Sequence, residues 1–129
     1  MRKVTTTAPS FPDVPLDQLL DLECGTRWQA TCGDAGHWRV GFYSPAETCA
    51  GDIKELETRD CPEFFLLLTG RLTLVLRDEN GVREVKLKQG KPILVEAAHC
   101  GYCPNGPYSG VALVVERDAF ETEYEPFGG

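Results

Sequence analysis

Histidine is scarce in this chain of 129 residues, which has only two, and no apolar stretch is long enough to cross a bilayer. A transmembrane helix needs roughly 18 consecutive apolar residues, whereas the longest runs, such as FFLLL at 64–68, are far shorter. Residues 1–10 are basic but are not followed by an apolar segment, so we expect no export signal and a cytoplasmic location. The sequence therefore predicts no membrane partner.

Positive charge is also thinly spread. The chain has 13 Lys and Arg against 20 Asp and Glu, a formal net charge of -7, and its basic residues form no cluster. Because affinity for nucleic acid rests largely on dense positive charge, the sequence predicts no nucleic-acid partner. With 42% hydrophobic and 26% charged residues, the composition is that of an ordinary globular protein with a single core.

The N-terminal part of the chain differs from the rest. Residues 1–25 are rich in proline and threonine, which suits an extended arm. Within this arm, leucines recur at helical spacing over 16–22, and we expect one short amphipathic helix there. Residues 26–129 are expected to form a single β domain.

Short segments of strand character, separated by turn residues, follow from residue 26 onward. Leucines at alternate positions of 72–76 predict a strand with one face in the interior and one in solvent. An Asn80-Gly81 turn then returns the chain as the antiparallel partner. With similar signals over 27–43 and 90–116, we expect about eight to nine strands and no βαβ unit, hence an all-β antiparallel jelly roll or barrel.

The spacing of glycines and charged residues between 51 and 70 is a second kind of signal. Gly51 is followed by five residues, then Glu57, one residue and Arg59. Three more residues lead to Glu63, and a further six lead to Gly70. This spacing resembles the first motif of the cupin superfamily, where a glycine, a His-x-His pair, a glutamate and a second glycine follow at these intervals.

Residues 90–105 resemble the second cupin motif in spacing but not in identity. Gly90 begins the motif and Asn105 ends it, but Gly101 stands where cupins have a histidine, and His99 lies two positions earlier. Since two positions preserve strand parity, His99 is still expected to point inward. The resemblance extends over residues 40–117 and implies a cupin-type antiparallel jelly-roll barrel, preceded by the N-terminal arm and helix.

The resemblance also implies a metal site, because many cupins bind a divalent transition metal through three histidines and one glutamate. Here Glu57 and Arg59 stand in two of the histidine positions. Arginine has no lone pair to donate, so Arg59 disfavours a metal at this place. If a metal does bind, its expected ligands are Glu57, Glu63 and His99, a set that suits manganese, iron or zinc.

The even spacing of Glu57, Arg59 and Glu63 predicts that all three point to one face of a strand, where two carboxylates and a guanidinium meet. Two interpretations stay open. In one, the charges form an internal ion network that fills a vacated metal site. In the other, Glu57, Glu63 and His99 are catalytic acid and base groups, while Arg59 and Tyr102 bind the ligand.

The sequence thus predicts a pocket for a small polar or anionic metabolite, with metal-independent acid/base chemistry of the isomerase or epimerase kind. One alternative is a metal-dependent dioxygenase, isomerase or lyase with a rearranged Glu57, Glu63 and His99 site. Another is a non-catalytic small-molecule sensor. The resemblance to cupins further implies a homodimer, formed through the N-terminal arm.

Six cysteines remain, and in a reducing cytosol they are expected to be thiols. Cys100 and Cys103 form a Cys-x-x-Cys pair, a pattern found in both zinc sites and redox sites. A structural zinc is an open hypothesis if Cys24 with Cys32, or His37, supply the remaining ligands.

Overall fold

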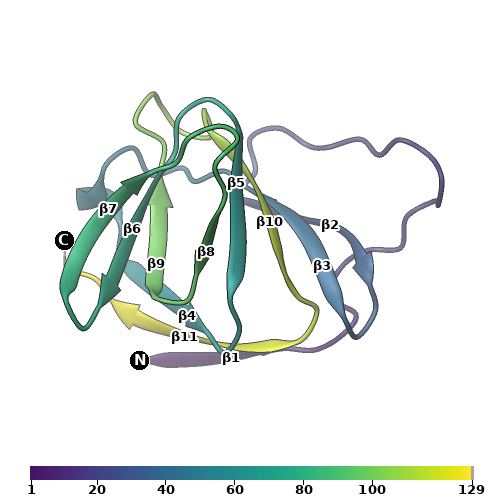
Figure 1. Ribbon diagram of the computed structural model, residues 1–129, viewed down its shortest axis with the longest axis horizontal. Helices are drawn as coiled ribbons and strands as arrows, with labels where there is room; N and C mark the ends of the chain where they lie inside the picture. The colour runs from purple at the N-terminus through teal and green to yellow at the C-terminus, as the bar shows by residue number, and fades with distance from the viewer. Residues whose placement is uncertain (129) are drawn as a thin grey trace.

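The computed structural model describes residues 1–128 and arranges them as eleven strands in two antiparallel sheets that face each other (Figure 1). The six-stranded sheet has the spatial order β1 (Arg2–Thr6), β11 (Phe120–Pro126), β4 (Glu55–Arg59), β9 (Ala98–Tyr102), β6 (Thr73–Asp78) and β7 (Gly81–Lys86). The five-stranded sheet has the order β2 (Trp28–Asp34), β3 (Trp38–Tyr43), β10 (Val111–Arg117), β5 (Glu63–Thr69) and β8 (Ile93–Val95). Most successive strands change sheet, as in a jelly roll, which confirms the predicted fold class. The described strands form two sheets rather than one continuously closed barrel.

The predicted hairpins are present, but β6 is buried more completely than its sequence indicated. Leu74 and Leu76 face the main core, as expected. On the opposite face of the strand, Thr73 is 3% and Val75 is 1% exposed, so the expectation that this face lies in solvent is wrong. The reason is a second apolar cluster, which covers that side of the sheet and consists of Ile53, Leu56, Val75 and Ala98.

The predicted helix at 16–22 is not formed. In residues 1–128 the single helical element is the 3-10 turn η1 (Ala50–Asp52), and Asp17 adopts a left-handed φ of 61°, which a helix does not tolerate. A short helix gains most of its stability by packing an apolar face, and here Leu16 and Leu19 remain 81% and 102% exposed. Within the same range, no helix is long and apolar enough to span a membrane.

The N-terminal arm is a strand of the domain rather than a free tail. All five residues of β1 pair with β11 of the same chain, between Arg2↔Tyr124 and Thr6↔Phe120. Farther along the arm, Ser10 donates from both its backbone N–H and its hydroxyl to Asp118, which is fully buried. The first ten residues of the arm are therefore anchored to the jelly roll at β1 and at Ser10, while the homodimer expected through the arm stays a prediction.

Candidate functional site

A cavity of about 480 Å³ lies between the two sheets. Residues of β1, β4, β9 and β11 line it on one side, and residues of β2, β3, β5 and β10 line it on the other. Its size is within the range of small-molecule sites. The polar residues that matter most for its chemistry are Arg39, Glu57, Arg59, Glu63 and His99.

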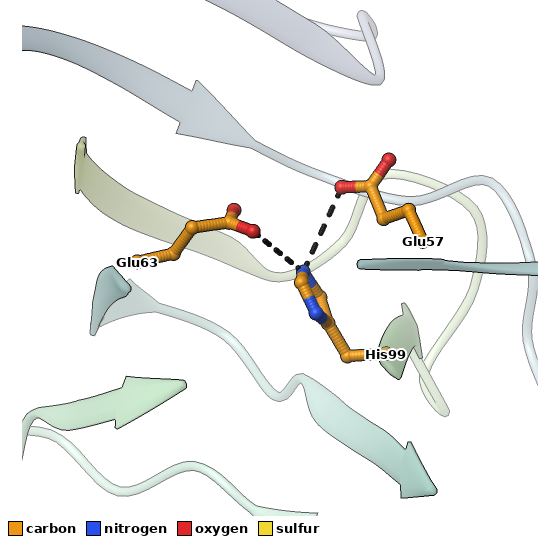
Figure 2. A group of neighbouring side chains, drawn as sticks. All are labelled: Glu57, Glu63 and His99. Carbon is orange, nitrogen blue, oxygen red and sulfur yellow. Dashed lines mark ion pairs between the residues drawn. The ribbon is translucent and has the colours of Figure 1, made fainter. Parts of the chain in front are cut away.

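Glu57, Glu63 and His99 converge in this cavity, with both carboxylates directed at the imidazole (Figure 2). Glu57 on β4 is paired in register with His99 on β9. The His99 Nε2 atom lies 3.2 Å from Glu63 Oε1 and 3.6 Å from Glu57 Oε1. Glu63 reaches the group from the facing sheet, because β4 ends at Arg59 and the chain crosses over before β5 begins. The expectation of a single strand carrying all three charges is therefore wrong, although they do meet.

The backbone determines which nitrogen of His99 faces the carboxylates. His99 Nδ1 lies 2.9 Å from the carbonyl oxygen of Ala97, and since a carbonyl only accepts, Nδ1 carries a hydrogen and donates it. If His99 is neutral, its Nε2 atom carries no hydrogen and points its lone pair at two carboxylate oxygens, which repel it. Burial lowers the pKa of His99, but the neighbouring Glu63 and Glu57 carboxylates outweigh burial and raise it above the ordinary value. The two carboxylates thus favour positive charge at Nε2, supplied either by a proton on the imidazole or by a bound metal cation.

Arg59 is held among three carboxylates. Its Nη1 donates to Glu116, its Nη2 lies 3.4 Å from Glu57, and its Nε lies 3.7 Å from Glu63. The guanidinium carbon also sits 4.2 Å from the centroid of the Phe120 ring, a cation–π contact. Burial tends to lower the pKa of Arg59, but the three carboxylates reverse the effect and raise it. Arg59 is therefore a permanent cation whose neighbours already neutralise it.

Arg39 and Glu116 extend this network beyond the residues that the sequence motifs indicated. Glu116, whose side chain is fully buried, accepts hydrogen bonds from Arg59 and from Arg39 Nε at 2.9 Å. Arg39 in turn donates to the backbone carbonyl of Ser10, in the N-terminal arm. The signal for Glu116 was strand parity, because it alternates inward with Ala112 and Val114. A charged residue on the buried face of a strand needs a partner.

Two buried nitrogens of the group have no hydrogen-bond partner in the described part of the chain. They are Arg59 Nε and His99 Nε2. Both lie near Glu63 Oε1, but neither satisfies hydrogen-bond geometry to it. Buried polar atoms are normally satisfied by protein, water or a ligand, so these two nitrogens are candidate donors to a bound acceptor.

The same group offers ligands for a metal. Within residues 1–128, one set of three or more His, Cys, Asp or Glu side chains has its ligand atoms close enough, namely Glu57, Glu63 and His99 within 4.8 Å of one another. A histidine whose Nδ1–H is held by a backbone carbonyl is the arrangement usual for ligating imidazoles. The nearby Arg59 cation opposes a second cation, as the sequence indicated.

Tyr102 lies elsewhere, whereas Cys100 is among the residues that line the cavity. Tyr102 is not among the residues that line the cavity, and its hydroxyl donates to the Glu84 carboxylate on β7 instead. Cys103 is fully buried and its sulfur accepts from the backbone N–H of Gly110. Because no group with three sulfur or imidazole ligands forms within residues 1–128, the hypothesis of a zinc site at Cys100 and Cys103 is wrong.

Comparison with known proteins identifies the fold. No family model matches the chain, and no curated protein matches it. Among solved structures, it is similar to a cupin-2 domain protein from Shewanella frigidimarina, with 13% identity and a TM-score of 0.52 over 75% of this chain and 84% of the other.

Two further structures are similar over a smaller share of their own length. An Fe(II) form of HppE matches at 15% identity with a TM-score of 0.55, over 84% of this chain and 65% of HppE. A vicilin from Solanum melongena matches at 11% identity and a TM-score of 0.48, over 63% of this chain, which spans only 21% of that vicilin. At these identities the likeness concerns the fold.

Proposed function

Since the chain has the cupin fold, we propose that its cavity binds a small polar metabolite and transfers a proton to and from it without a metal. The reaction class is the isomerisation or epimerisation of a carbonyl compound. The observation that carries the proposal is a pair of buried nitrogens, Arg59 Nε and His99 Nε2, that lack a hydrogen-bond partner among residues 1–128 and lie next to the Glu57 carboxylate.

The proposed roles follow from these positions. A substrate carbonyl oxygen placed between Arg59 Nε and His99 Nε2 accepts from both, which stabilises negative charge on that oxygen. Glu57, whose side chain is 27% exposed to the cavity, takes the proton from the neighbouring carbon. His99 gives its Nε2 proton to the oxygen, which forms an enol and a neutral imidazole. In an isomerisation, Glu57 then returns the proton to the former carbonyl carbon while the hydroxyl on the neighbouring carbon gives its proton to His99, which leaves the new carbonyl and the imidazolium. In an epimerisation, the proton returns to the opposite face of the same carbon after the enol has turned over beside Glu57, and the enol hydroxyl gives its proton back to His99.

Charge balance supports a neutral substrate rather than the anionic one considered at the sequence level. Arg59 already faces Glu57, Glu63 and Glu116, so its charge is not available to a second carboxylate or phosphate. An anion placed here meets these carboxylates at short range, where repulsion amounts to several kcal/mol. Hydroxylated ketones and aldehydes carry the required carbonyl without this penalty.

The first experiment screens neutral ketoses, aldoses and hydroxyketones by thermal shift, and then follows hits by proton NMR in D₂O. We expect exchange of the hydrogen next to the carbonyl with wild type. In Glu57→Gln, which retains shape but not basicity, exchange should fall by about 10²–10⁴-fold.

Tyr102→Phe is the matched control, because Tyr102 lies outside the cavity, and it should exchange at the wild-type rate. A hit that exchanges equally fast with Glu57→Gln contradicts the assigned base. A hit that binds with no exchange at all favours the sensor alternative.

A metal centre is the second candidate, favoured by the closeness of the Glu57, Glu63 and His99 ligand atoms. HppE, whose fold is similar, has been described in Fe(II) and Co(II) forms. A bound divalent metal supplies Lewis acidity toward a substrate oxygen. Metal analysis of protein purified without chelator separates the candidates: stoichiometric metal that is lost in Glu63→Gln contradicts the metal-independent proposal.

A further inference from the structure

Trp28 is a large aromatic side chain in the cavity wall to which the proposed reaction gives no role. It begins β2, opposite Tyr43 on β3, and is half-buried. The indole reaches across β3 to Gly41: a Cβ atom placed on Gly41 would lie 2.2 Å from Cη2 and 2.3 Å from Cζ2 of Trp28. The six-membered ring of the indole therefore lies directly on the backbone of Gly41.

Glycine is the residue type that this placement requires. Any other residue at position 41 carries a Cβ atom in the space that the indole fills. A glycine inside a strand weakens the strand and often marks the close approach of another group. Gly41 faces the interior, because its partner in register on β10 is Val114 of the core. The indole is therefore seated on the inner surface of β3, and the part of it that Gly41 does not cover borders the cavity.

Arg39 holds the indole from one side. Because Arg39 lies two residues before Gly41 on β3, its side chain points to the same face of the strand. Its guanidinium carbon lies 5.1 Å from the centroid of the Trp28 ring, a cation–π contact. The guanidinium is itself held by the buried Glu116 carboxylate, which also accepts from Arg59. The indole is therefore connected to Arg59 through packed side chains.

Tyr43 connects the indole to His99 on the other side of Gly41. The Tyr43 ring meets the Phe65 ring edge to face, with centroids 6.2 Å apart. Phe65 meets the His99 imidazole in the same way, with centroids 5.6 Å apart. An aromatic surface contributed by the five-stranded sheet therefore extends from Trp28 to the imidazole.

The cavity has two unlike sides. Opposite the aromatic surface, Glu57, Arg59 and His99 come from the six-stranded sheet. At about 30 Å³ for each water molecule, the cavity volume of about 480 Å³ holds about 16 water-sized groups. A three-carbon hydroxyketone leaves much of this space empty, whereas a six-membered ring with oxygen substituents fills more of it. Such a ring also offers a C–H face to the indole and a polar edge to the opposite side.

We propose that Trp28 is the specificity-determining residue of the cavity and selects a cyclic hydroxyketone, whose C–H face packs on the indole. The inference rests on the proposed function, which places the ring carbonyl between Arg59 Nε and His99 Nε2 and assigns the base to Glu57. A rigid ring loses little conformational freedom when it packs on a fixed surface, whereas an open chain loses more. The indole therefore favours cyclic over open-chain substrates.

Calorimetric titration with two six-carbon hydroxyketones tests the proposal. Adipoin is a six-membered ring and propioin is an open chain, and both carry a hydroxyl group next to the carbonyl. We expect wild type to bind adipoin about tenfold more tightly than propioin. Trp28→Leu should weaken the binding of adipoin about tenfold and that of propioin little, because leucine is apolar but offers no flat face. Trp38→Leu is the matched control, since Trp38 is 46% exposed and outside the cavity wall, and it should bind adipoin as wild type does.

Gly41→Ala displaces the indole without removing it. The added methyl group occupies the seat of Trp28 and should also weaken adipoin binding about tenfold. Gly51→Ala is the control, because a Cβ atom added there meets nothing closer than Cys49 Sγ at 3.7 Å. Circular dichroism checks the fold of each variant, and if either Trp28→Leu or Gly41→Ala fails to fold, the other still decides.

Nuclear Overhauser contacts give a test that leaves the cavity wall unchanged. In Trp38→Phe, Trp28 is the one tryptophan left in the chain, so a labelled indole reports on the cavity. We expect contacts between this indole and the ring hydrogens of adipoin. Their absence at saturating adipoin overturns the proposal, as does a wild type that does not bind adipoin at millimolar concentration.

Exchange of the hydrogen next to the carbonyl in D₂O separates this inference from the proposed function. Trp28→Leu should slow exchange about tenfold at low adipoin concentration but leave the rate at saturation within about twofold, since the indole does not touch the reacting atoms. If adipoin binding depends on Trp28 but exchange is no faster with wild type than with Glu57→Gln, the assigned base is wrong and Trp28 still selects the ring. If both ketones exchange equally well and Trp28→Leu changes neither, the proposed function stands and selection by Trp28 is wrong.

Discussion

Two central strands pass from a charged end of the interior to an apolar end. On β5 the inward residues run from Glu63 to Phe65 and Leu67, and on β10 they run from Glu116 to Val114 and Ala112. All of these inward residues are buried, so burial alone does not distinguish the two ends.

The apolar end is closely packed and the charged end adjoins the cavity. The main core cluster gathers leucines of β6 around Phe65, and Leu74 at its centre is fully buried. The ring of Phe65 also meets the His99 imidazole edge to face, with centroids 5.6 Å apart. Apolar packing stabilises without specifying a chemistry, whereas a buried ion network costs desolvation, and here it places charged groups beside the cavity. The difference suggests that the apolar end supports the fold and the charged end serves the site.

Glu116→Gln should have the largest effect on stability. The change leaves the Arg39 and Arg59 guanidiniums facing a neutral amide in a fully buried place. Breaking a buried ion pair in this way costs about 3 to 5 kcal/mol of the free energy of unfolding, measurable by urea denaturation. Glu123→Gln, which removes an exposed partner of Lys3, is the control and should cost less than about 1 kcal/mol. Similar losses in both variants contradict a stabilising role for the buried network.

Leu74→Ala should cost about 2 to 5 kcal/mol, because it opens a cavity at the centre of the apolar end. Unlike Glu116→Gln, it should leave the NMR titration of the His99 imidazole unchanged, since Leu74 carries no charge and is not in the cavity wall. Val82→Ala, at an exposed position, controls for shortening a side chain. A shift of the His99 titration in Leu74→Ala contradicts the separation of the two ends.

The sequence predicted the strands whose local signals were strong. The paired strands around the Asn80-Gly81 turn and the inward direction of His99 both followed from turn chemistry and period-two alternation. The last strand, β11, has the same signal, a strict alternation of Phe120, Thr122 and Tyr124 with glutamates, although the expected strands ended at residue 116. The local alternation of polar and apolar residues is therefore sufficient to predict a strand that has one polar face.

Elements that depend on distant contacts were not predictable in the same way. The leucines at 16–22 have helical spacing, but the positive φ of Asp17 and the lack of a packing surface prevent a helix. Residues 2–6 form a strand only because β11 is available to pair with them. The motifs located Glu57, Glu63 and His99, but Arg39 and Glu116 join the site through a register between strands that are far apart in sequence.

The pH dependence of His99 gives the smallest but most specific test of the charged end. Glu57 and Glu63 face the imidazole, and Arg59 pairs with both of these carboxylates. The two carboxylates raise the pKa of His99 against the effect of burial. A raised pKa means that protonation stabilises the fold: the contribution is complete below the unfolded value of about 6.5 and is lost as pH rises through the folded value.

For Glu63, burial raises the pKa, but His99 and Arg59 outweigh burial and lower it. Its contribution is therefore present above its unfolded value and is lost when the pH falls through the folded one. We expect maximal stability between these two limits. Imidazole NMR, with His37→Gln to assign the two histidines, should show His99 titrating above about 6.5 and Glu63→Gln moving it downward. An unchanged titration in Glu63→Gln contradicts the ion pair, and with it the proton that the proposed reaction takes from His99.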